Sequence, residues 1–142
     1  MAMIDSRTWL LHLSDAECWR LLDEHAVGRI GVLVDSAPEV YPVNYRTDGR
    51  SILFRTDPGS KLHGLERSPS VCFELDAIEP ASRTGWSVLV KGRARSLVDA
   101  DELRAAARRP IEYWSIGTKA HWVRIDPYEV TGRRILPRKD EG

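Results

Sequence analysis

Hydrophobic and polar positions alternate along several short segments of the chain, a pattern typical of strands. Trp86, Val88 and Val90 alternate with Ser87, Leu89 and Lys91, which gives a strand over 86–95 one apolar face. Residues 27–34 are rich in β-branched side chains and glycine, and they predict another strand. Further strands are expected over 39–46, 51–56, 70–75, 121–126 and 128–135.

Two features mark how these strands connect. Asp48-Gly49 lies between the strands predicted over 39–46 and 51–56, and this pair indicates a tight hairpin because glycine adopts positive φ without cost. Pro42 has no main-chain N–H to donate to a neighbouring strand. We therefore expect a bulge or an unpaired strand edge at Pro42, and a loop over 76–85.

Three segments predict helices. Ser14 and Glu17 form a capping box for a helix that runs to about His25, and Asp99 and Glu102 form a second box. The second helix is expected to end near residue 109, and a short third helix is predicted over 60–67. With about seven strands joined mainly by hairpins, the pattern favours an antiparallel barrel over a doubly wound sheet.

Composition narrows the class of protein. A chain of 142 residues fits a single domain, here 1–142 with a core over about 13–135, and it buries roughly 68% of its unfolded surface. Its 21 basic and 21 acidic residues cancel, which argues against a nucleic-acid or anionic-membrane partner. Cys18 and Cys72 are not spaced for a metal, so no metal site is expected. Without a long apolar run or a recognisable leader, we expect a cytoplasmic protein.

The segment "FRTDPGSKLHG" over 54–64 carries the most suggestive chemistry. Arg55 and Lys61 supply positive charge, while Thr56 and Ser60 supply hydroxyl groups. The amino end of the helix predicted after Gly59 would add unpaired main-chain amides, which favour anions. From these residues alone the segment is either an anion-binding cradle or an ordinary turn.

Four segments in order give the chain a resemblance to a known family. They are "YPVNYRTDGRSILFRTDPGSKL", "VCFELD", "TGWSVLVKGRA" and the closing "VRIDPYEVTGRRI". Together they resemble the split-barrel flavin-binding family, which includes pyridoxamine 5'-phosphate oxidases, nitroimidazole-resistance proteins and flavin/deazaflavin oxidoreductases. The resemblance covers roughly 13–135. The short chain and its layout of terminal arginines are more similar to the nitroimidazole-resistance branch than to the vitamin B6 oxidases.

The resemblance implies a mainly β fold, a six-stranded antiparallel split β-barrel of the Greek-key, FMN-binding type with short flanking helices. It also implies a homodimer with flavin at the subunit interface. The residues it assigns to the cofactor fall in three groups. Arg55, Thr56, Ser60 and Lys61 would hold the phosphate, Val43, Asn44 and Tyr45 would lie along the ring, and Trp86, Ser87 and Val88 would contact the ring or ribityl chain from the partner.

The function that the resemblance implies is a flavin-dependent oxidoreductase that binds FMN and transfers hydride or electrons to a small organic substrate. A reductase that uses the 8-hydroxy-5-deazaflavin coenzyme is an alternative within the same fold. A non-catalytic flavin- or haem-binding protein is a second alternative. Since the cofactor supplies the chemistry in such proteins, no catalytic acid or base is assigned.

Overall fold

The computed structural model describes residues 3–5, 7–114 and 120–138. Within these ranges the chain forms eight strands and three helices. In chain order they are β1 (Met3–Asp5), β2 (Leu10–His12), α1 (Asp15–Glu24), β3 (Val27–Val34), β4 (Ala37–Asp48), β5 (Ser51–Thr56), α2 (Ser60–Arg67), β6 (Ser70–Glu79), β7 (Thr84–Ser96), α3 (Ala100–Ala107) and β8 (His121–Ile135).

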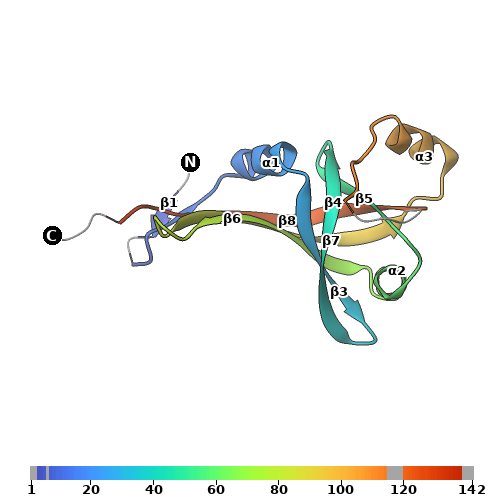
Figure 1. The fold of residues 1–142 in the computed structure, drawn as a ribbon, viewed down its shortest axis with the longest axis horizontal. Helices are drawn as coiled ribbons and strands as arrows, with labels where there is room; N and C mark the ends of the chain where they lie inside the picture. Colours follow the sequence, from blue (N-terminus) through green and yellow to red (C-terminus); the bar gives the residue numbers. More distant parts are fainter. Residues whose placement is uncertain (1–2, 6, 115–119, 139–142) are drawn as a thin grey trace.

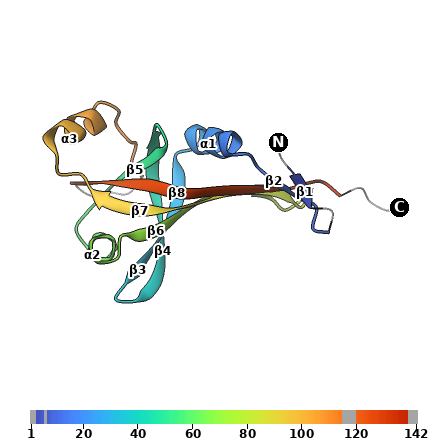
Figure 2. The same ribbon diagram turned by 180° about the vertical axis from the view of Figure 1, so that it is seen from behind.

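Six of the strands close into a ring. The pairing order is β8-β5-β4-β3-β6-β7, and β7 pairs again with β8. Every pairing is antiparallel, which confirms the predicted split barrel. The long strands β6, β7 and β8 continue beyond the barrel as a ribbon, which β1 and β2 extend (Figure 1). Both views place α2 and α3 at the end of the molecule opposite to the chain termini (Figures 1 and 2).

The barrel core is built from side chains that alternate along the strands. Tyr45, Phe54 and Phe73 are at most 2% exposed, and the Tyr45 and Phe73 rings meet edge to face at 4.8 Å. Gly28 is required here, because a Cβ at this position would lie 2.2 Å from the Phe73 ring. The Tyr45 hydroxyl donates to the carbonyl oxygen of Leu22 at 2.7 Å and so ties α1 to the barrel.

The helix boundaries agree with the capping pattern of the sequence. The Ser14 hydroxyl accepts from the main-chain N–H of Glu17, and His25 is the C-cap of α1. The Asp99 carboxylate accepts from the main-chain N–H groups of Asp101 and Glu102 at the start of α3. None of the helices in the described ranges is long and apolar enough to cross a membrane.

The structure differs from the strand pattern predicted in three places. Residues 121–135 form one strand, because a register shift opposite Lys91 and Gly92 accommodates Pro127 without ending the pairing. Much of the loop expected over 76–85 is instead paired, since Ala77–Glu79 face Thr84–Trp86 in a hairpin. β1 and β2 were not expected from their sequence. Each has three residues, and Leu10 and Leu11 are both half-buried, so neither shows the alternation of buried and exposed side chains that marks a core strand.

Candidate functional site

The site begins at an unpaired edge of β4. Residues 37–44 pair with β3, whereas in the described structure β5 reaches only Tyr45–Asp48. We call the edge of 37–44 that faces away from β3 the open edge. The N–H of Tyr45 donates to the carbonyl oxygen of Ala26 at 3.0 Å. The N–H and C=O groups of successive residues of a strand point to opposite sides, so those of Asn44 face the open edge. Pro42, two residues earlier, faces the same side. This confirms the unpaired edge expected at Pro42.

Ser60 and Lys61 come to this edge from the amino end of α2. The Lys61 ammonium lies 5.6 Å from the centre of the Tyr41 ring, on β4. The Tyr41 hydroxyl donates to the Glu39 carboxylate. This bond raises the pKa of Tyr41, and a hydrogen bond from Ser60 acts in the opposite direction. A hydroxyl, an ammonium and a helix amino end therefore meet beside one strand edge.

α2 is held in this place by close packing on β3. A Cβ on Gly64 would lie 2.6 Å from the carbonyl oxygen of Leu33. Leu62 and Leu65 are buried on the same helix. The Gly59 N-cap offers no side-chain hydrogen bond to the first turn of α2. This helix amino end is consequently suited to an anion rather than to a capping side chain.

Arg55 and Thr56 point to opposite faces of β5. Thr56 is 3% exposed on the core side, and its hydroxyl donates to the carbonyl oxygen of Asp57 at 3.2 Å. The Arg55 guanidinium lies outside the barrel, 5.1 Å from the centre of the Trp122 ring and 5.8 Å from that of Tyr113. Of these two neighbours, the Arg55 side chain is therefore better placed to reach a ligand outside the barrel.

The three residues of β4 that were predicted to contact the flavin ring point to two different faces of the strand, because side chains alternate along it. Val43 and Tyr45 are buried in the core, and burial raises the pKa of Tyr45. Their main-chain groups face β3, where the N–H of Tyr45 bonds to Ala26, so neither residue presents a polar group to the open edge. Asn44 faces outward, and its side-chain oxygen accepts from the N–H of Trp114 at 3.0 Å.

The remaining predicted residues lie apart, on β7. In the ring of strands, β7 pairs with β6 and β8 and has no pairing with β4 or β5. Val88 is fully buried, and the Trp86 ring meets His25 edge to face at 5.0 Å. Ser87 points out of the barrel into a different hollow. The predicted site is thus split between two parts of the chain.

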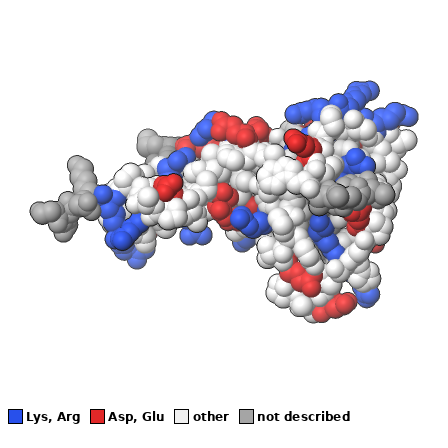
Figure 3. All heavy atoms as spheres, viewed as in Figure 1, with Lys and Arg blue, Asp and Glu red and all other residues white. Residues whose placement is uncertain are grey.

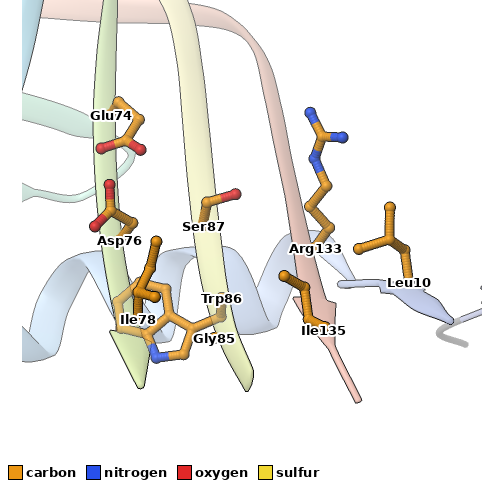
Figure 4. A pocket seen from close by; sticks show the side chains of 9 residues that line it. All are labelled: Leu10, Glu74, Asp76, Ile78, Gly85, Trp86, Ser87, Arg133 and Ile135. Atoms are coloured by element: carbon orange, nitrogen blue, oxygen red, sulfur yellow. The ribbon is translucent and has the colours of Figure 1, made fainter. Parts of the chain in front are cut away.

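That hollow has a volume of about 350 Å³ on the ribbon of long strands. Figure 4 shows the carboxylates of Glu74 and Asp76 turned toward each other on β6, next to Ser87. Arg29 lies 3.3 Å from Glu74 and 3.2 Å from Asp76. Burial, followed by the hydrogen bond and charge of Asp76, raises the pKa of Glu74 to about 7, although Arg29 acts in the opposite direction.

Tyr41 and Arg46 lie around the open edge and are not among the residues that the sequence predicts for a site. Tyr113 and Trp114 lie there too, and the sequence alone leaves open whether they line an interface, a substrate pocket or the core. Arg46 and Tyr113 carry no motif that could have indicated them, because their partners lie about 60 or more residues away. Tyr41 could have been found, since it precedes Pro42 on the expected edge. Among the described residues, no group of three His, Cys, Asp or Glu side chains is suited to a metal ion.

Comparison with known proteins identifies the family of the chain. The model of the pyridoxamine 5'-phosphate oxidase family matches residues 14–134. The chain belongs to this family. The FAD-binding protein from Mycobacterium smegmatis is 39% identical, with a TM-score of 0.74 over 87% of this chain and 97% of that one. An FAD-binding protein from Mesorhizobium loti is 27% identical, with a TM-score of 0.75 over 88% and 96% of the two chains.

The fold is also shared with more distant members. A Bacteroides thetaiotaomicron protein assigned to 5-nitroimidazole antibiotic resistance has a TM-score of 0.71 over 94% of this chain and 92% of its own. At 15% identity this likeness shows the fold alone.

Proposed function

We propose that the chain binds a flavin along the open edge of β4 and serves as a flavin-dependent oxidoreductase acting on a small organic substrate. The observation that carries the proposal is the meeting of Ser60, Lys61 and the amino end of α2 at Tyr41. The two FAD-binding proteins described above share the fold over nearly the whole chain, which supports the same class of ligand here.

The residues at the edge fit the phosphate of a flavin. Lys61 would provide a full positive charge, Ser60 a hydroxyl, and the first turn of α2 its main-chain amides. Arg55 would add a second cation from the outer face of β5. Thr56 is given no part in this contact, because its side chain is in the core and its main chain pairs with His121 on β8.

The protein's part in the chemistry is then binding and orientation. When bound, a flavin supplies hydride or electron transfer, and the polypeptide controls its position and access. The main-chain groups of Asn44 and the side chains near Tyr41 would fix the ligand along β4. No described side chain is assigned as an acid or base.

Charge favours a cofactor with more than one anionic group. Acidic and basic side chains are mixed over most of the face in Figure 3, but basic ones gather at the end that carries α3. Arg104, Arg108 and Arg109 are exposed there. FAD and the deazaflavin coenzyme both extend beyond one phosphate, and they stand beside FMN as candidates.

An absorption spectrum of the purified protein tests the proposal. Bands near ~450 nm are expected for FMN or FAD, and a band near ~420 nm for the deazaflavin. Mass spectrometry of the released chromophore separates FMN from FAD. A Soret band would favour the haem-binding alternative. A colourless protein that also fails to bind added FMN, FAD or deazaflavin would exclude the proposal.

The division of the predicted site supports a homodimer. Within one chain, Trp86 and Ser87 lie away from the open edge of β4, because among the described strands β7 pairs with β6 and β8. A second copy could bring its β7 to the open edge. The ribbon of long strands offers apolar surface for this contact, since Ile78 is 71% and Ile135 is 43% exposed.

A further inference from the structure

We infer that Trp114 forms one wall of this site and stacks on the planar ring of the bound flavin, and that Asn44 and Arg46 are the residues that position it. The inference rests on the proposed function. It adds a ligand contact that is not among the residues that the resemblance assigns to the cofactor.

The main chain of Trp114 is fixed while its side chain is free of the core. Its N–H donates to the side-chain oxygen of Asn44 at 3.0 Å. Its indole is 75% exposed, which is unusual for so large an apolar group. Asn44 is the last residue of the open edge, so its contact places the main chain of Trp114 next to that end of the edge.

Outward-facing residues of β4 and β5 hold the whole segment that leads to Trp114. Arg46 donates to the carbonyl oxygens of Ala106 at 2.8 Å and of Arg109 at 2.9 Å. On β5, Arg55 stacks on Tyr113, the residue before Trp114. Segment 106–114 is therefore held against the barrel by residues of both β4 and β5. The main chain of Trp114, from which the indole projects, is fixed in position.

A planar heteroaromatic ring is the ligand chemistry that suits this wall. An indole supplies a large flat surface, and stacked aromatic pairs are stabilised beyond the area they bury. The isoalloxazine ring of a flavin is such a partner. Because the Trp114 main chain is already held, little ordering is required when the ring binds.

The experiment compares flavin affinities by titrating FMN and FAD while following flavin absorbance and fluorescence. Trp114→Ala is expected to weaken binding about 3- to 10-fold, and Trp114→Phe to recover most of the loss. Trp9→Ala is the matched control, because Trp9 is 52% exposed on the segment between β1 and β2. Circular dichroism verifies that each variant is folded.

The positioning role is tested by a double-mutant cycle. If Asn44 acts through Trp114, Asn44→Ala combined with Trp114→Ala should lose no more affinity than the larger single variant. Fully additive losses would contradict the positioning role. Unchanged affinity in Trp114→Ala, with Lys61→Ala still impaired, would overturn the inference and leave the proposed function standing. A Trp114→Ala variant that forms less dimer but binds flavin with unchanged affinity would also overturn the inference, because Trp114 would then be a subunit contact.

Discussion

At the scale of single residues, the hydroxyl oxygen of Tyr45 links helix α1 to the barrel core. Its ring packs on Phe73 in the core, while its hydroxyl reaches the Leu22 carbonyl oxygen in α1. A buried hydrogen bond of this kind stabilises the folded state, and an unpaired carbonyl oxygen left behind carries a desolvation cost. The Tyr45 hydroxyl therefore adds to the attachment of α1, which also buries Trp19 and Leu22 in the core.

Tyr45→Phe should lower the free energy of unfolding by about 1–2 kcal/mol, because it removes the hydroxyl and keeps the ring. Chemical denaturation followed by circular dichroism measures this difference. Tyr128→Phe is the control, since Tyr128 is 63% exposed. Equal stability of the two variants would argue that the hydroxyl of Tyr45 contributes nothing to the attachment of α1.

Glu74 makes the stability depend on pH. Its pKa in the folded protein, about 7, lies above its ordinary value of 4.5. The folded state therefore binds the proton more tightly than the unfolded state, and stability falls as pH rises between these two values. Because the Glu74 side chain is 35% exposed, solvent reduces the size of the effect.

Glu74→Gln should lose this part of the pH dependence, since its neutral amide does not titrate. Denaturation midpoints at about pH 5 and pH 8 should differ less in this variant than in the wild type. Glu66→Gln, on the exposed side of α2, should behave as the wild type does. A Glu74→Gln variant with an undiminished difference would show that other groups set the dependence.

At the scale of elements, the position of α2 decides whether its amino end can serve the open edge. The helix lies against β3 through Gly64, with no room for a side chain at that point. Displacing α2 would move Ser60 and Lys61 together, because both belong to its first turn. Packing and binding are linked through this contact.

Gly64→Ala should reduce stability by about 1–3 kcal/mol, the usual cost of overpacking, and should also weaken flavin binding. Denaturation and flavin titration measure the two effects. Glu66→Ala, on the same helix but facing solvent, is the control. If Gly64→Ala kept full affinity despite lower stability, the helix position would not govern the binding of the ligand.

The strands and helices of the barrel were largely predictable, because side-chain alternation and helix capping depend on residues close together in the sequence. Burial alternates along β7 with the sequence, and Ser14 and Asp99 cap the helices they were expected to cap. The single strand β8 was not predictable from the pattern around Pro127. Whether a proline ends a strand or sits at a bulge depends on its partner, and here β7 shifts register to keep the pairing.

The site was predictable only in part. Ser60 and Lys61 follow from local motifs at a turn and a helix start. The packing of Arg55 on Tyr113 and Trp122 and the contact between Asn44 and Trp114 join residues 58 to 70 positions apart, so no short pattern indicates them. Strand alternation could have shown that Arg55 and Thr56 face opposite sides.

At the scale of the whole molecule, the ribbon of β6, β7 and β8 extends beyond the barrel (Figure 1). Ile78 and Ile135 are exposed on it. In the proposed homodimer this ribbon would contact the second copy and supply Trp86 and Ser87 to its flavin. Assembly and cofactor binding would then depend on each other.

Ile78→Asp should therefore produce a monomer and weaken flavin binding, because it places a charge on the apolar part of the ribbon. Sedimentation velocity separates a 16.1 kDa monomer from a dimer of twice that mass. Val98→Asp is the control, since Val98 is 85% exposed near α3. A wild-type protein that sediments as a monomer at micromolar concentration would contradict the proposed interface.

The most direct test of a phosphate held at the amino end of α2 is the flavin affinity of Lys61→Ala, measured by titration with FMN and FAD. Losing a charge-assisted hydrogen bond should cost about 1.5–3 kcal/mol, or roughly 10- to 150-fold in affinity. Lys91→Ala, which removes an exposed ion pair with Glu129, should bind as the wild type does. Wild-type affinity in a folded Lys61→Ala variant would contradict the account.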